Sequence, residues 1–158
     1  MKNSMILVLM VLTLFLGCST PKKQESAFIV IKTPTMKYAD MGFIETSDSK
    51  VNVEIYAAGQ PLVSFEINAL NVCISTFQCM EKKEFNKKVL SRYYPDDLLE
   101  NIFRAKPIFN KENFVKKEDG FVQKITKDNF YSISYEVKGR SRTFRDTINK
   151  ILIKVREQ

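Results

Sequence analysis

Apolar and polar side chains alternate most clearly on both sides of the segment AAGQP at residues 57–61. Every second residue is apolar in 51–56, and the same period of two returns in 63–69. Such alternation across a Gly/Pro turn predicts an antiparallel hairpin with one buried face. Short β-branched tracts predict further strands at residues 27–33, 36–46 and 70–75. Gly42 predicts a bulge or bend in the second of these strands, and Asn71 a kink in the third.

The period changes to that of a helix in the middle of the chain. Residues 81–94 carry apolar side chains at four-residue spacing, and Pro95 then opens a second predicted helix. Lys106-Pro107 ends this second helix. Its apolar stripe consists of Leu98, Leu99, Ile102 and Phe103. We therefore expect two helices, each with one buried face.

The last third of the chain returns to the period of strands. We expect strands at residues 121–125, 131–137 and 151–155, with a turn at 138–142. The segment 143–149 leads into the last strand. Strands followed by helices and then by strands again, without internal repeats, indicate an α+β fold with an antiparallel sheet and helices packed on one face.

A separate apolar segment, residues 5–16, lies within the start of the chain and runs into the sequence FLGCST. As a helix it would span about 18 Å, well below the ~30 Å hydrocarbon core of a membrane. With Lys2 before it and small residues after it, it has the form of a secretory signal peptide. Cys18 resembles the cysteine of the bacterial lipoprotein lipobox, which accepts a diacylglycerol before the chain is cut just ahead of it. Phe15 and Leu16 depart from the Leu and the Ala or Ser that are common in that family.

This resemblance divides the chain into a cleaved signal peptide at residues 1–17, a lipidated tether at 18–26 and one domain at 27–158. Acyl chains on Cys18 imply an anchor in a membrane. Ser19, which is not the Asp of an inner-membrane retention signal, favours the outer membrane, and we expect the domain to face the periplasm. The alternative is an ordinary signal peptide whose cysteine carries no lipid.

The charge balance predicts a basic surface. The chain has 25 basic and 18 acidic residues, a formal charge of +7, and cleavage of the leader would remove only Lys2. We do not expect nucleic acid as a partner of an exported, tethered chain, whereas anionic lipid head groups are available to it. Candidate contacts to such head groups are Lys138, Arg140, Arg142 and Arg145. The alternative is a solvated hairpin tip.

Two further cysteines, Cys73 and Cys79, lie in the part expected to be exported. An oxidising compartment makes this pair a candidate disulfide. In one continuous strand their Cα atoms would lie about 20 Å apart, whereas a disulfide needs them within about 7 Å. A disulfide therefore requires the chain to reverse within residues 74–78. A redox-active pair is the alternative, although catalytic pairs are usually closer together, as CxxC.

The sequence offers no recognisable catalytic constellation. It contains no histidine, the commonest general base and metal ligand. Neither a glycine-rich nucleotide motif nor a nucleophile elbow occurs in it. The acidic pairs at residues 96–97 and 118–119 lie at a helix start and in a turn, where capping and solubility explain them. We therefore expect no enzymatic activity, no metal and no cofactor.

The layout of the body is similar to that of the LolA/LolB family of periplasmic carriers and outer-membrane receptors for lipoproteins. The similarity rests on the hairpin at 51–69, the insert YYPDDLLENIFRAKPIF and the closing segment at 131–155. It implies an unclosed antiparallel half-barrel wrapped over helices, with an apolar cavity for acyl chains. The chain departs from the family in replacing its opening helix by AFIVIKT, in lacking tryptophan and in carrying the cysteine pair.

This resemblance predicts a cavity lined by Val53, Ile55, Phe65, Ile67, Leu99 and Phe103. The same residues suit an ordinary dry core. The hypothesis we prefer is a non-enzymatic outer-membrane lipoprotein that binds lipid or the acyl chains of another lipoprotein. A structural or assembly lipoprotein whose exposed strand edges bind an envelope protein is the second, and a redox protein that uses the cysteine pair is the third.

Overall fold

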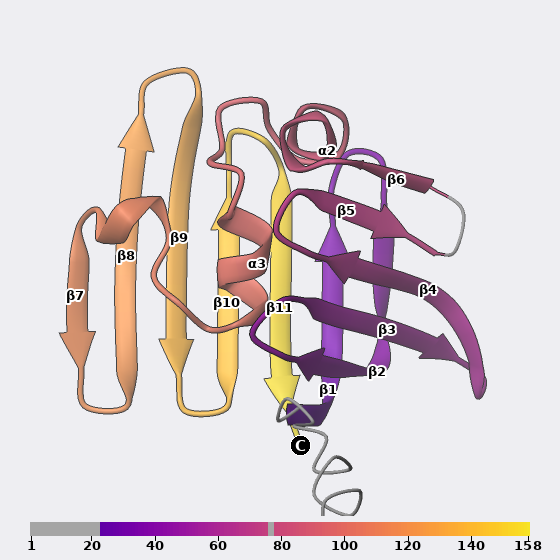
Figure 1. Cartoon of the computed structure of the whole chain (residues 1–158). Coiled ribbons are helices and arrows are strands. Elements are labelled where there is room, and N and C mark those ends of the chain that lie inside the picture. The colour runs from indigo at the N-terminus through magenta and orange to yellow at the C-terminus, as the bar shows by residue number, and fades with distance from the viewer. Residues whose placement is uncertain (1–22, 76–77) are drawn as a thin grey trace, which may run out of the picture.

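Eleven strands form one antiparallel sheet in the described part of the chain, residues 23–75 and 78–158 (Figure 1). In the computed structural model they are β1 (Lys23–Lys32), β2 (Lys37–Thr46), β3 (Val51–Ala57), β4 (Gln60–Ile67), β5 (Asn71–Ile74), β6 (Gln78–Glu81), β7 (Phe114–Lys117), β8 (Gly120–Lys127), β9 (Tyr131–Lys138), β10 (Ser141–Asp146) and β11 (Ile151–Glu157). The strands form two meanders, β1–β6 and β7–β11, which join where β1 pairs with β11. The sheet stays open, with β6 and β7 at its edges.

The first strand begins at Lys23, four residues before the expected start of the domain. It pairs with β2 along its whole length, beginning with Lys23 opposite Thr46. The polar side chains of residues 23–26 predicted a tether, but the backbone of β2 offers hydrogen bonds regardless of side-chain polarity. These four residues therefore belong to the sheet.

The hairpin predicted from the alternation is confirmed as β3 and β4, with a shift of register between Ile55 and Tyr56. Gly42 causes no register shift in β2, so no bulge occurs there. A Cβ at Gly42 would lie 2.0 Å from the carbonyl oxygen of Glu54, so the glycine permits a close approach of β3. Figure 1 shows β3–β6 running across the direction of β7–β11, which makes the sheet strongly coiled.

Three short helical elements follow β6: α2 (Lys82–Val89), α3 (Leu98–Phe103) and the 3₁₀ turn η2 (Phe109–Lys111). Both α-helices lie in the predicted segments but are shorter than predicted. Pro95 does not open α3, because a turn closed by a 3.1 Å hydrogen bond from the Leu98 N–H to the Pro95 carbonyl precedes it. Ala105 adopts a left-handed conformation (φ 53°) just after α3 and ends it. Figure 1 shows α3 in front of β10 and β11.

The predictions of the C-terminal strands are confirmed, but the turn between two of them is shorter than predicted. β8, β9 and β11 confirm the strands expected at 121–125, 131–137 and 151–155. The expected turn at 138–142 is reduced to Gly139 and Arg140, since β10 already begins at Ser141.

The core lies on the inner face of the sheet, beneath the two helices. It contains side chains from both meanders, such as Val53, Phe144 and Ile153, together with Leu98 and Ile102 of α3. Burying a large aliphatic side chain contributes about 1.5–3 kcal/mol to folding, so the helices stabilise the sheet mainly through this contact. No helix within residues 23–75 and 78–158 is both long and apolar enough to cross a membrane.

Candidate functional site

The six apolar residues expected to line a cavity all lie on the inner face or on α3. Their exposed fractions are 0% for Val53 and Ile55, 2% for Phe65, 1% for Ile67 and Phe103, and 4% for Leu99. All six belong to one core cluster, which also contains residues of β1, β2 and β8–β11. The fold thus brings the hairpin and the helix together as packed core, and an acyl chain that entered this core would need the space that α3 occupies.

Polar contacts hold α2, α3 and the segment between them together. Nζ of Lys82 lies 2.7 Å from Oε2 of Glu100, and Nε of Arg104 lies 2.9 Å from Oε1 of the same residue. Burial would raise the pKa of Glu100, but the two cations outweigh it and lower that pKa below its usual value. Asn86 donates a 3.0 Å hydrogen bond from Nδ2 to the Pro95 carbonyl. These contacts are internal to the helical segment, so they do not tie it to the sheet.

Two buried polar residues of the sheet hold the helical segment in place. Asp146 on β10 is 1% exposed, and its Oδ2 accepts a 2.5 Å hydrogen bond from the Tyr94 hydroxyl. Gln123 on β8 is fully buried, and its side chain forms hydrogen bonds with the backbone just before and just after η2. Its Oε1 accepts from the Ile108 N–H at 2.8 Å, and its Nε2 donates to the carbonyls of Ile108 and Glu112 at 2.9 and 2.7 Å. Neither residue was predicted from the sequence. The inward position of Gln123 in a predicted strand was an available signal, whereas Asp146 lies in a segment that was not predicted as a strand.

The four basic residues expected to contact lipid phosphates do not share one surface. Lys138 and Arg140 are exposed at the β9–β10 turn, and Arg145 is exposed on the outer face of β10. Arg142 is only 3% exposed, because the alternation along β10 points it inward, where it forms an ion pair with Glu157. The inward position removes Arg142 from any contact with a membrane surface.

A charged hollow of about 220 Å³ opens at the end of the inner face where β1 begins. Ion pairs between Lys23 and Glu25 and between Arg142 and Glu157 lie along it. Burial would raise the pKa of Glu25, but its hydrogen bonds to Lys23 and Glu157 outweigh burial and lower it. Most of these charges are compensated by a partner, so an ion-pair network closes this end of the core.

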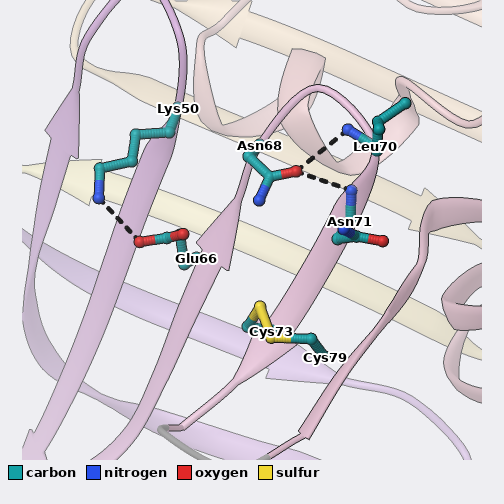
Figure 2. The surroundings of a disulfide bond; sticks show 7 residues. All are labelled: Lys50, Glu66, Asn68, Leu70, Asn71, Cys73 and Cys79. Carbon is teal, nitrogen blue, oxygen red and sulfur yellow. Dashed lines mark hydrogen bonds and ion pairs between the residues drawn. A yellow bond between two sulfur atoms is a disulfide. The ribbon is translucent and has the colours of Figure 1, made fainter.

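Cys73 and Cys79 form a disulfide across β5 and β6 (Figure 2), with an S–S distance of 1.99 Å and a Cα–Cα distance of 3.9 Å. The two cysteines lie directly opposite each other, because the chain reverses between the two strands as the spacing required. The disulfide therefore fastens one edge hairpin of the open sheet.

The turn that precedes β5 is closed by a side chain. Oδ1 of Asn68 accepts hydrogen bonds from the backbone N–H groups of Leu70 and Asn71, at 3.1 and 2.8 Å (Figure 2). The chain reverses here, and β5 runs antiparallel to β4. The kink expected at Asn71 is therefore wrong; the feature is a full turn.

The edge strand β7 exposes apolar side chains. All four residues of β7 are exposed, and Phe114 and Val115 retain 38% and 52% of their accessible surface. Within the described residues no strand pairs with the outer edge of β7 or of β6. β7 thus offers free backbone groups and apolar side chains to an added strand.

The proposed lipidation site, Cys18, and the predicted signal peptide lie outside the described residues. Their roles stay predictions from the sequence. In a comparison with known proteins, no family model matches the chain, and no curated protein matches it either.

Proposed function

We propose that the protein is a non-enzymatic lipoprotein of the outer membrane, facing the periplasm, that binds lipid or the acyl chains of another lipoprotein in an apolar half-barrel. The observation that carries this proposal is the open eleven-stranded sheet, whose apolar inner face is covered, in the part of the chain that the structure describes, by two short α-helices. In this proposal the two helices move aside, so that the sheet exchanges its contacts with their apolar side chains for contacts with a ligand.

The exchange is energetically balanced. Burying about ten CH₂ groups of an acyl chain gains about 8 kcal/mol. Exposing Leu99 and Phe103 costs about 2–3 kcal/mol each. Breaking the Tyr94–Asp146 hydrogen bond adds about 1.5–3 kcal/mol to that cost. With the Gln123 bonds around η2 kept intact, gain and cost are of similar size, so loading and release are reversible.

Lipidation of Cys18 would hold the sheet close to the membrane, because the segment before β1 is short. Only four residues, 19–22, separate Cys18 from the first residue of β1. The five peptide steps from Cys18 to Lys23 reach at most about 18 Å when fully extended. Acyl chains on Cys18 would therefore keep the sheet close to the lipid surface from which it takes or receives its ligand.

Photolabelling tests the proposal. The full-length lipidated protein is placed in vesicles that contain a phospholipid with a diazirine in its acyl chain, and labelled peptides are mapped after irradiation. We expect adducts on the peptides that carry Phe103 and the β3–β4 hairpin. Phe103→Trp, which adds bulk inside the core, should reduce this labelling several-fold, whereas Phe114→Trp on exposed β7 should not. Labelling confined to outer-face peptides, or unaffected by Phe103→Trp, would refute binding in the half-barrel.

A structural or assembly lipoprotein is the second candidate, and the exposure of β7 is the observation that favours it. A partner strand would pair with the free edge of β7 and cover Phe114 and Val115. A photoreactive residue at position 115 would then crosslink to an envelope protein in cells, while the same residue at position 93 would not. Absence of any protein adduct at 115 would argue against this candidate.

A further inference from the structure

The outer face of the sheet carries an apolar surface that is separate from the core. Phe28 of β1 lies directly opposite Met41 of β2, and Ser26 lies opposite Phe43. Met41 and Phe43 are each 41% exposed. The Phe43 ring meets Tyr56 of β3 edge-on, with centroids 5.8 Å apart.

Val30 lies on the same outer face but is nearly buried, so it adds little exposed area. It is 8% exposed, yet it stands outside the core cluster that contains its neighbours Ile29 and Ile31. Ala39 of β2 and Lys154 of β11 lie opposite it on either side. Phe28, Val30, Met41, Phe43 and Tyr56 therefore form one continuous area, here named the outer apolar patch.

A row of cations borders the outer apolar patch. Arg156 lies opposite Phe28 and Lys154 opposite Val30, both on β11, and Arg145 follows on the outer face of β10. Lys32 and Lys37 lie opposite each other at the far end of the β1–β2 hairpin. Within residues 23–75 and 78–158, none of these five cations forms an ion pair with a carboxylate.

The chain topology creates this combination. The apolar residues belong to β1–β3, whereas Lys154 and Arg156 lie near the end of the chain and reach them only because β1 pairs with β11. β1 is also the strand into which the proposed lipidated segment runs. The outer apolar patch is thus the exposed apolar surface next to the point where the anchor joins the sheet.

We propose that the outer face of β1, β2 and β11 docks onto the anionic surface of the membrane in which the chain is anchored. Apolar and aromatic side chains enter the interfacial region, and the five cations lie beside lipid phosphates. This inference rests on the proposed lipidation of Cys18. A second copy of the chain is the alternative occupant, and the quenching experiment below distinguishes it from the membrane.

Tryptophan fluorescence tests the docking, because the chain contains no tryptophan. Phe43→Trp reports on the outer apolar patch, and Phe114→Trp is a matched control with 38% exposure on β7. Each full-length lipidated variant is reconstituted in phosphatidylcholine vesicles with phosphatidylglycerol as the minor anionic lipid. Brominated phosphatidylcholine, which quenches tryptophan on contact, then measures membrane insertion.

We expect a blue-shifted emission and at least about twofold stronger quenching for Phe43→Trp than for Phe114→Trp. Adding Lys154→Glu and Arg156→Glu to Phe43→Trp should remove most of this difference. Equal quenching at the two positions would refute the docking. A blue shift that increases with protein density but is not accompanied by quenching would also refute it, because it would indicate contact with a second copy. Flotation with the vesicles is recorded in parallel: its loss would refute the anchor and the docking together, whereas flotation with equal quenching would refute the docking alone.

Discussion

The hydroxyl of Tyr94 donates a 2.5 Å hydrogen bond to Oδ2 of Asp146, which joins the segment between the helices to the end of β10. The other carboxylate oxygen of Asp146 accepts from three backbone N–H groups, those of Ser132, Ile148 and Asn149, at 3.1, 2.9 and 3.2 Å. One buried carboxylate thus connects the helical segment, the start of β9 and the turn before β11. In the proposed function this bond is one that must break when the helices move.

Removing the Tyr94 hydroxyl should destabilise the protein in a pH-dependent way. Burial would raise the pKa of Asp146, but the hydrogen bonds from Tyr94 and Asn149 outweigh it and lower the pKa. The ionised carboxylate therefore stabilises the fold above its unfolded pKa, near 3.8, and this stability is lost as the pH falls through the lower folded value. Tyr94→Phe should cost about 1.5–3 kcal/mol at neutral pH. The cost should shrink once the pH falls below the folded pKa.

Urea unfolding at a series of pH values measures this effect. Tyr93→Phe is the matched control, since Tyr93 is the adjacent tyrosine and is 47% exposed. Its substitution should change the free energy of unfolding by less than about 0.5 kcal/mol. Equal effects of the two substitutions would show that the bond to Asp146 contributes nothing to stability.

The Cys73–Cys79 disulfide should act as a structural staple. A loop of this size stabilises the fold by roughly 2 kcal/mol, because it restricts the unfolded chain. The double variant Cys73→Ser/Cys79→Ser should lose about that much stability and open the β5–β6 hairpin first, as faster hydrogen exchange in residues 71–81. Thiol titration of the native protein should find neither cysteine reactive until a reductant is added. Two free thiols in protein isolated from cells would contradict this role.

Gly42 should tolerate no larger residue. A Cβ there would lie 2.0 Å from the Glu54 carbonyl oxygen and 3.0 Å from Cδ1 of Ile29, so β2 and β3 would have to separate. We expect Gly42→Ala to lower the free energy of unfolding by about 2 kcal/mol or more. Ser26→Ala, at an exposed position on neighbouring β1, serves as the control and should stay within about 0.5 kcal/mol. A neutral Gly42→Ala would mean that the two strands approach less closely than described.

The sequence predicted the strands in which local alternation is strong, and it failed where a partner strand decides the structure. The β3–β4 hairpin and β9 could be located because every second residue is apolar. β7 could not, since its four residues FVKK show no alternation and are exposed on both faces. The pairing of β1 with β11 could not be predicted either, because no local pattern records which distant strand supplies the hydrogen bonds.

The residues of the candidate site could likewise be predicted only in part from the sequence. The six apolar residues could be named as buried, but a sequence cannot say whether buried residues surround a cavity or fill it. Arg142 was expected at the surface because it lay within the predicted turn at 138–142. The compensating charge of Glu157, which lets it be buried, comes from the neighbouring strand β11. Gln123 and Asp146 escaped notice, since their hydrogen-bond partners belong to distant segments.

The mass of the intact protein, released from native membranes in mild detergent, tests lipid binding by an anchored half-barrel most directly. Native mass spectrometry should find a chain that begins at Cys18, carries covalent acyl groups and holds one additional lipid molecule non-covalently. Mild collisional activation should remove the additional lipid and leave the covalent acyl mass. A chain that keeps its first seventeen residues, or one that carries acyl groups but no bound lipid, would contradict the proposed function.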